Sequence, residues 1–184
     1  MINSRCEGTN IFSIGKKNLI LRSLGKFQLE YFAKIIDNLK GSLRFEVPYT
    51  IKIGGQEVAR IYDAIVEYAG KTTKYEMKNW AKWYPSTIKN QFIKDLQSIK
   101  NLDELKWVFN TTSGVTKANL KSKIISTLRK ADGKPIEELE RLFKNEDIVK
   151  KLKNIFGEDI KTSKDILNKL NDDKIFNQIF EIVE

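Results

Sequence analysis

The sequence has no histidine and only one cysteine among its 184 residues. The absence of an imidazole excludes Ser/His/Asp and Cys/His catalytic triads, HExxH zinc sites and every nuclease that uses histidine as a base or a metal ligand. Cys6 alone can form neither an intramolecular disulfide nor a cysteine-rich zinc site, which fits a reducing compartment. If the protein is an enzyme, we expect carboxylates, lysines and a metal ion to carry the chemistry.

Long hydrophobic runs are also missing. No segment approaches the roughly 18–20 apolar residues that a membrane helix needs, and Arg5, Glu7 and Lys16 interrupt the first 20 residues. We therefore expect no membrane span and no signal peptide, and a cytoplasmic site of action. With 41% apolar residues, a chain of this length is expected to form one domain with an ordinary core.

Positive charge is in excess and unevenly distributed. Lys and Arg number 33 against 24 Asp and Glu, a net charge of +9. Residues 1–114 carry +7, residues 115–131 carry +5 and residues 132–184 carry −3. Such an excess is typical of proteins that bind nucleic acid or an anionic membrane surface, and it can also serve solubility alone.

Hydrophobic spacing predicts a mixed α/β unit in the first part of the chain. Helical spacing predicts a helix over 24–40 and another after Pro85, through Ile88, Phe92 and Leu96. Alternation predicts a strand meander with a turn at Ala69-Gly70, and a short apolar run predicts a fourth strand; the four predicted strands are 43–53, 57–67, 72–79 and 105–109. Pro48 favours an edge position for the first of these strands.

The remaining chain shows helical spacing only. Predicted helices cover 116–131, 136–144, 147–156, 163–170 and 172–183. We accordingly divide the chain into an N-terminal arm (1–23), an α/β core that ends in a basic helix (24–131) and a helical extension (132–184).

One hairpin concentrates groups that can perform chemistry. A hairpin with an even loop centred between Ala69 and Gly70 places Asp63 opposite Glu76, and period 2 adds Lys78 to the same face. Like charges on opposed residues are destabilising, by about 0.2–1 kcal/mol in water and by more when desolvated. A divalent cation such as Mg²⁺ or Mn²⁺ would relieve this repulsion, because Mg²⁺ is usually held by one or two carboxylates and a substrate phosphate. The alternative is a surface salt-bridge cluster on a solvated sheet.

The pattern Asp63, a gap of 12 residues and then Glu76-Met77-Lys78, on a hairpin between two helices, resembles the PD-(D/E)xK nuclease superfamily over roughly residues 24–110. Tyr62 stands where the signature has proline. The resemblance implies a restriction-endonuclease-like core of helix, three-strand meander, helix and strand. It also implies that Asp63, Glu76 and the carbonyl of Met77 bind one or two Mg²⁺ ions, while Lys78 positions the attacking water or stabilises the transition state.

Two further residues resemble supporting positions of that superfamily. Glu30 matches, in order, a glutamate of the first helix that completes the metal site in many relatives, although it falls nearly opposite the apolar stripe of its helix. Gln91 resembles a glutamine of the second helix that some relatives use near the site. Both positions also fit ordinary solvated side chains.

Candidate nucleic-acid contacts lie next to the hairpin and in the basic helix. Trp80 and Lys82 follow Lys78 closely, and aromatic side chains can stack on bases, although aromatic residues beside a sheet are more often core. The helix over 116–131 has no acidic residue, so its lysines can track phosphates, lie on a membrane or stay solvated. The lysines in question are Lys117, Lys121 and Lys123.

These features together predict a divalent-metal-dependent endonuclease that acts on DNA or tRNA. A short basic core without a separate sequence-reading module resembles the toxin domains at the C-termini of bacterial contact-dependent and polymorphic toxins. That resemblance implies delivery into a target bacterium and a dedicated immunity protein, expected to be acidic. The alternatives are a housekeeping or restriction-type DNA nuclease and a non-catalytic basic nucleic-acid-binding module.

Overall fold

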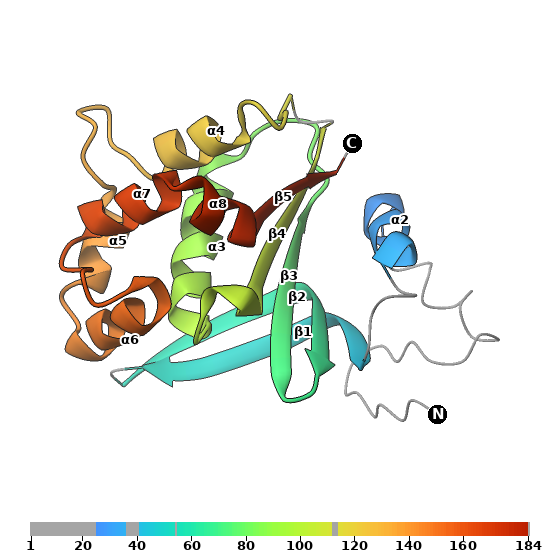
Figure 1. The fold of residues 1–184 in the computed structure, drawn as a ribbon, viewed down its shortest axis with the longest axis horizontal. Coiled ribbons are helices and arrows are strands. Elements are labelled where there is room, and N and C mark those ends of the chain that lie inside the picture. Colours follow the sequence, from blue (N-terminus) through green and yellow to red (C-terminus); the bar gives the residue numbers. More distant parts are fainter. Residues whose placement is uncertain (1–24, 36–40, 54, 112–113, 184) are drawn as a thin grey trace.

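The structure is a computed structural model that describes residues 25–35, 41–53, 55–111 and 114–183. Its centre is a five-stranded sheet in the order β1-β2-β3-β4-β5 (Figure 1). Helices cover both faces, so the expected α/β class is confirmed. The N-terminal arm, 1–23, lies outside the described residues.

The predicted meander forms the first three strands, and their pairing is antiparallel. The strands are β1 (Ser42–Ile53), β2 (Gln56–Tyr68) and β3 (Lys71–Lys78). The turn between β2 and β3 lies at Ala69 and Gly70, both with positive φ. Because the numbers of paired residues sum to 139 from Tyr68↔Lys71 to Ala64↔Tyr75, the predicted register is confirmed. β1 lies at the sheet edge, where Pro48 loses no ladder bond to a further strand.

A crossover through helix α3 turns the fourth strand parallel to the third. Helix α3 (Pro85–Ser98) begins with proline at its first turn, where a missing N–H costs nothing, and buries Ile88, Phe92 and Leu96. The short helix η2 (Leu102–Glu104) follows, and β4 (Leu105–Asn110) then pairs in parallel with β3. The predicted order of helix, meander, helix and strand is therefore observed.

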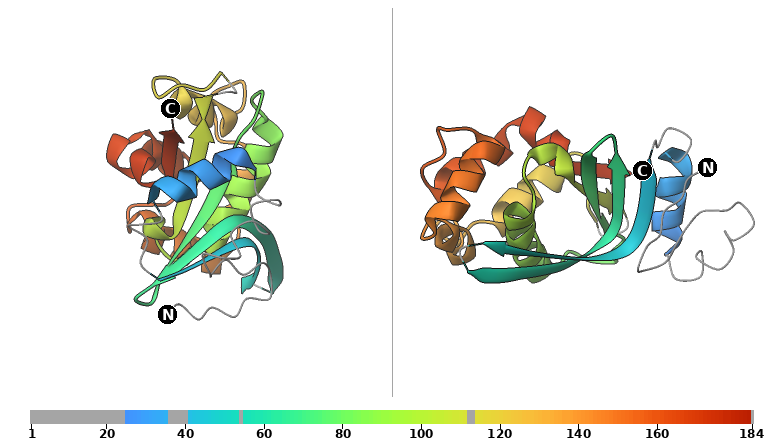
Figure 2. Two further views of the ribbon diagram at one scale, coloured as in Figure 1. Left: turned by 90° about the vertical axis from the view of Figure 1, so that its right-hand side faces the viewer. Right: turned by 90° about the horizontal axis from the view of Figure 1, so that it is seen from below.

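The sheet separates two apolar clusters. Helix α2 (Lys26–Ile35) packs Phe27, Tyr31 and Phe32 against one face, together with Phe45 and Tyr75 of the sheet. Helix α3 and the C-terminal helices cover the other face, where the larger cluster lies (Figure 2). The predicted first helix extended over 24–40; residues 36–40 lie outside the described part.

The C-terminal part is helical except at its end. Its helices are α4 (Leu120–Thr127), α5 (Glu137–Leu142), α6 (Glu146–Phe156), α7 (Ser163–Asn171) and α8 (Asp173–Ile179). The predicted helix over 172–183 is wrong beyond Ile179, because Phe180–Val183 forms β5 and pairs in parallel with β4. The predicted helix over 116–131 is likewise shorter in the structure. Among the described residues, no helix has the length and apolar character needed to cross a membrane.

Candidate active site

The ladder between β2 and β3 ends one residue before the two predicted carboxylates. The last pair is Ala64↔Tyr75, so Asp63 and Glu76 stand where the two strands separate. β1 and β2 also lack a pair at Glu46 and Asp63, and Glu46 has a φ of 49°. On either side of this irregularity the strands contribute to opposite clusters, since Ala64 packs on the α2 side and Tyr62 on the α3 side. Asp63 therefore lies at a twist in its strand.

Asp63 is bound from the backbone of the neighbouring strand. Its Oδ2 accepts a hydrogen bond of 2.6 Å from the N–H of Met77, and its other oxygen accepts none from the described residues. Burial and the nearby carboxylate of Glu76 raise the pKa of Asp63 to about 6, against the opposing effects of the Met77 N–H, Lys78 and Arg60. The repulsion expected between the two carboxylates is thus present.

Glu76 is buried and held by two cations. Arg60 donates from Nη2 to Oε2 at 2.7 Å, and Lys78 donates from Nζ to Oε1. The side chains of all three residues are less than 7% exposed. A carboxylate offers about four lone-pair directions, so Glu76 can still accept further ligands beside these two cations.

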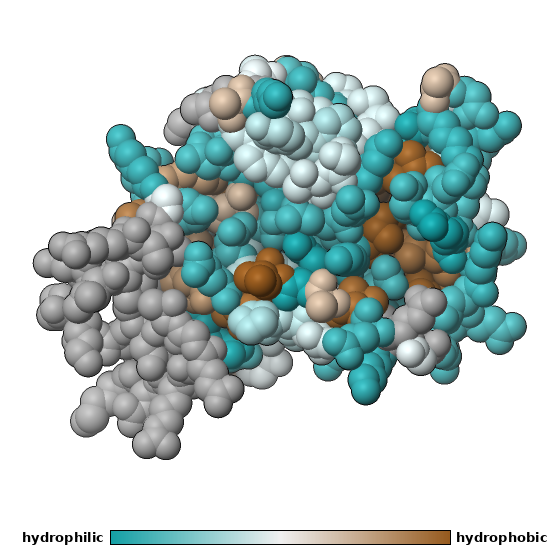
Figure 3. Space-filling model, turned by 180° about the vertical axis from the view of Figure 1, so that it is seen from behind, coloured by the Kyte–Doolittle hydropathy of each residue, from teal (hydrophilic) through white to brown (hydrophobic). Residues whose placement is uncertain are grey.

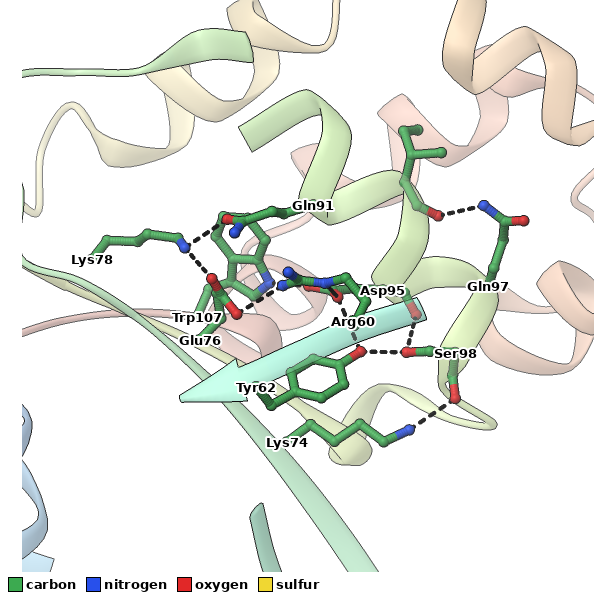
Figure 4. Close-up of polar contacts among 11 residues, drawn as sticks. Arg60, Tyr62, Lys74, Glu76, Lys78, Gln91, Asp95, Gln97, Ser98 and Trp107 are labelled. Carbon is green, nitrogen blue, oxygen red and sulfur yellow. Dashed lines mark hydrogen bonds and ion pairs between the residues drawn. The ribbon is translucent and has the colours of Figure 1, made fainter. Parts of the chain in front are cut away.

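Lys78 contacts Gln91, the glutamine that the sequence singled out on the second predicted helix. Lys78 Nζ donates to Gln91 Oε1 at 2.7 Å, from β3 to helix α3 (Figure 4). Its ammonium also lies 4.7 Å from the ring centroid of Trp107 and 5.0 Å from that of Trp80. Cation–π contacts of this kind fix the ammonium and stabilise its charge in a desolvated setting.

Two groups of the site were missed by sequence reasoning, namely Arg60 and Asp95. Asp95 is fully buried in helix α3 and accepts hydrogen bonds from Arg60 Nε at 2.7 Å, Tyr62 OH at 3.0 Å and Trp107 Nε1 at 2.8 Å. Burial raises the pKa of Asp95, and the Arg60 guanidinium opposes this effect. For Arg60, burial lowers the pKa, but the carboxylates of Asp95 and Glu76 outweigh it and raise the value above its usual range. Arg60 therefore stays charged between two carboxylates (Figure 4).

Lys74 completes the polar layer on this face of β3. It is 1% exposed, donates to the carbonyl of Ser98 at 2.8 Å and lies 4.0 Å from the ring centroid of Tyr49. Burial lowers the pKa of Lys74 to about 8, although the nearby Glu104 opposes the shift. The face is thus lined by alternating cations and anions rather than by apolar side chains.

The local charge leaves room for a cation. Asp63, Glu76 and Asp95 lie near Arg60, Lys78 and Lys74, and Lys74 also pairs with Glu104 at 3.7 Å. Four carboxylates thus face three cations, and one net negative charge remains if all seven groups are ionised. Among the described residues, however, no group of three or more Asp, Glu, Cys and His side chains could hold a metal ion. The residues fit a divalent ion only in the mode in which one or two carboxylates share the ion with substrate phosphate and water.

Glu30 does not join this cluster. Its carboxylate is 57% exposed and forms an ion pair of 3.6 Å with Lys26, four residues earlier on α2. Helix α2 packs on the sheet face opposite to α3. Met77 contributes its N–H to the site, and its side chain is buried on the α2 side.

The predicted nucleic-acid contacts lie on two neighbouring segments. Between β3 and α3, the ammonium of Lys82 lies 5.4 Å from the ring centroid of Tyr84, which packs edge-on against Trp80. On α4, the ammonium of Lys123 lies 5.6 Å from the ring of Trp83, and Lys121 pairs with Asp173 at 2.8 Å. Lys117 is exposed just before that helix. Trp83 itself stacks on buried Phe109 and so belongs partly to the core.

Comparisons with known proteins identify no relative. No protein-family model matches the chain, and neither the curated proteins nor the solved structures contain a match.

Proposed function

We propose that the protein is a divalent-metal-dependent nuclease that hydrolyses phosphodiester bonds of DNA or tRNA. The observation that carries the proposal is the convergence of Asp63, Glu76, Lys78 and Gln91 at the point where β2 and β3 separate. Two mutually repelling carboxylates beside an ammonium form an arrangement that a divalent cation and a phosphate would neutralise together.

Asp63, Glu76 and the carbonyl of Met77 would hold the ion. When bound, a divalent cation of this kind polarises the scissile phosphate and lowers the pKa of a bound water. Lys78 would donate hydrogen bonds to the phosphate oxygens and so stabilise the negative charge that develops on them. Gln91 orients Lys78 for this role. Arg60 fixes the orientation of the Glu76 carboxylate, and Asp95 fixes Arg60 in turn.

The proposed biological role is that of a bacterial toxin domain, delivered into a target bacterium and neutralised by an acidic immunity protein. A housekeeping or restriction-type nuclease would use the same site. A different class, the non-catalytic nucleic-acid-binding module, is favoured by one observation, namely that both oxygens of Glu76 already have buried cationic partners.

Cleavage assays decide between these functions. The protein is incubated with plasmid DNA and with total tRNA, each with Mg²⁺, with Mn²⁺ and with EDTA. We expect cleavage of one substrate with metal and none with EDTA. Lys78→Met should abolish it, and so should Asp63→Asn, whose amide oxygen keeps the hydrogen bond from the Met77 N–H. The matched control is Lys164→Met, which removes an exposed lysine of α7 and should cleave like the wild type. Full activity of Lys78→Met would reject the site assignment.

A further inference from the structure

A groove opens beside the candidate active site. It lies between helix α3 and the outer halves of β1 and β2, and it has a volume of about 550 Å³. The residues that matter here are Pro48, Arg60, Ile61, Asn90, Gln91 and Lys94. Two of them, Arg60 and Gln91, are also members of the candidate active site, so the groove borders that site.

Both shared residues keep hydrogen-bond donors unused. Arg60 donates from Nε and Nη2 to carboxylates, whereas its Nη1 donates to none of the described residues and is not one of the buried polar atoms that lack a partner. Gln91 accepts from Lys78 through Oε1, and its amide nitrogen has no partner within the described part of the chain. An acceptor with several oxygens, such as a phosphodiester, would satisfy these donors.

The groove is cationic and has an apolar wall. Its lining contains no carboxylate and two cations, of which Arg60 is already paired with Asp95 and Glu76, so that Lys94 carries the uncompensated charge. The exposed Lys94 forms no ion pair with any residue in the described ranges. Ile61 is 64% exposed and is paired with Pro48 across the ladder. On the side of the molecule where the β1–β2 ribbon lies, hydrophobic residues form only small separate patches in a hydrophilic surface (Figure 3).

We propose that this groove binds the nucleic-acid strand that adjoins the scissile phosphate. Phosphate groups contact Lys94 and the amides of Asn90 and Gln91, while a sugar or base packs on Ile61 and Pro48. A polyanion that also carries flat apolar groups matches this lining, and its phosphates would continue into the site at Lys78. The inference rests on the proposed nuclease function for the orientation of the bound strand relative to the scissile phosphate, but binding of the strand can be tested without cleavage.

The test measures binding of a short fluorescent single-stranded DNA and of an RNA of the same sequence, in EDTA so that neither is cut. Lys94→Gln and Ile61→Asp are compared with two matched controls. Lys164→Gln removes an exposed lysine from α7, and Tyr68→Asp places a carboxylate at the exposed far end of the strand that carries Ile61. All four positions are on the surface, and circular dichroism verifies folding of each variant.

We expect Kd to rise at least about threefold for Lys94→Gln and Ile61→Asp, and to stay within the error of the wild type for the controls. The dependence of log Kd on log salt should become shallower by roughly 0.7 for Lys94→Gln, which is the value for one phosphate contact on a single strand. The more strongly affected oligonucleotide indicates whether DNA or RNA occupies the groove. Equal weakening by Lys164→Gln, unchanged binding by both groove variants, or no binding by the wild type overturns the proposal. If groove-dependent binding is found in a protein that cuts neither DNA nor tRNA, the groove assignment stands and the nuclease function fails.

Discussion

Asp63, which is half-buried, and Glu76, which is buried, are neighbouring carboxylates in different electrostatic settings. Glu76 is neutralised by Arg60 and Lys78, whereas Asp63 has a single backbone donor. Burial, and then the repulsion from Glu76, raise the pKa of Asp63 to about 6. A carboxylate in such a setting costs stability, and under the proposed function this cost would provide the capacity to bind a cation.

This difference predicts opposite effects of two isosteric substitutions. The folded-state pKa of Asp63 lies above the ordinary value of 3.8, so the unfolded chain loses this proton first and stability falls as pH rises between about 4 and 6. Asp63→Asn removes that loss and should raise the melting temperature at about pH 7.5, with a gain that vanishes near pH 4. Glu76→Gln leaves the buried ammonium of Lys78 without its carboxylate and Arg60 paired only with Asp95, and it should cost about 3 kcal/mol.

Thermal unfolding of the metal-free proteins at several pH values measures both effects. Mg²⁺ should then raise the melting temperature of the wild type and leave that of Asp63→Asn unchanged, because binding to the folded state alone stabilises it. A destabilised Asp63→Asn at about pH 7.5 would show that the carboxylate is satisfied as it stands, and would argue against the proposed metal site.

Asp95 illustrates a residue whose role is to position another. It binds Arg60, Tyr62 and Trp107 with one carboxylate. Asp95→Asn should lose about 3 kcal/mol in urea unfolding, since it leaves Arg60 paired only with Glu76 and the Trp107 N–H without an acceptor. If the role extends to catalysis, kcat should fall with little change in KM and the pH profile of the rate should shift; a stability loss without either change would limit Asp95 to structure.

At the scale of elements, local patterns predicted the hairpin and missed its partners. Period 2 and the turn at Ala69-Gly70 were sufficient for the register that brings Asp63 to Glu76. Arg60 was not predicted as a site residue, because a period of 2 places its side chain on the face opposite to Asp63. The twist at Asp63 breaks this alternation of faces. A signal for Asp95 was nevertheless available, since a carboxylate on the apolar stripe of Ile88, Phe92 and Ile99 requires a buried partner.

The end of the chain shows a different limit of local reasoning. Phe176, Ile179 and Phe180 fit helical spacing, but Phe180 to Val183 instead complete the sheet. Pairing in parallel with β4 satisfies backbone groups that a local pattern cannot anticipate. Short apolar runs of this kind are ambiguous between helix and strand until the partner strand is known.

The lysines of helix α4 and of the segment before it differ in their partners. Lys121, on the helix, pairs with Asp173, whereas Lys117, which is exposed before the helix, forms no ion pair with a described residue. If the helix tracks phosphates, Lys117→Gln should reduce the slope of log Kd against log salt by roughly 0.7–0.9. Lys121→Gln should reduce it less, since the pair with Asp173 already occupies this cation. Equal, unchanged slopes for both variants in filter-binding titrations would assign the helix to solvent or to a membrane surface.

At the scale of the whole molecule, charge is separated along the chain. Residues 1–131 carry a net charge of +12, whereas the remaining residues carry −3. The candidate site, the groove and α4 all belong to the positive part, while α5 to α8 close the other side of the core. Under the proposed function, this positive charge would steer polyanions toward the site, and an acidic protein would be attracted to the same part of the chain.

The proposed toxin role predicts an effect of the whole protein on bacterial growth. Expressed alone in a bacterial cytoplasm, the wild-type protein should arrest growth, and Lys78→Met, which lacks the ammonium beside Glu76, should not. If a small acidic protein is encoded beside it, co-expression of that protein should restore growth, because one such partner can cover the positive residues and exclude phosphates. Growth curves with matched expression levels measure this. If the wild type is harmless yet cleaves nucleic acid in vitro, a restriction or repair role is favoured. If it is harmless and cleaves nothing, the constellation of Asp63, Glu76 and Lys78 serves a binding module, and the ion pairs of Glu76 are then its structural support.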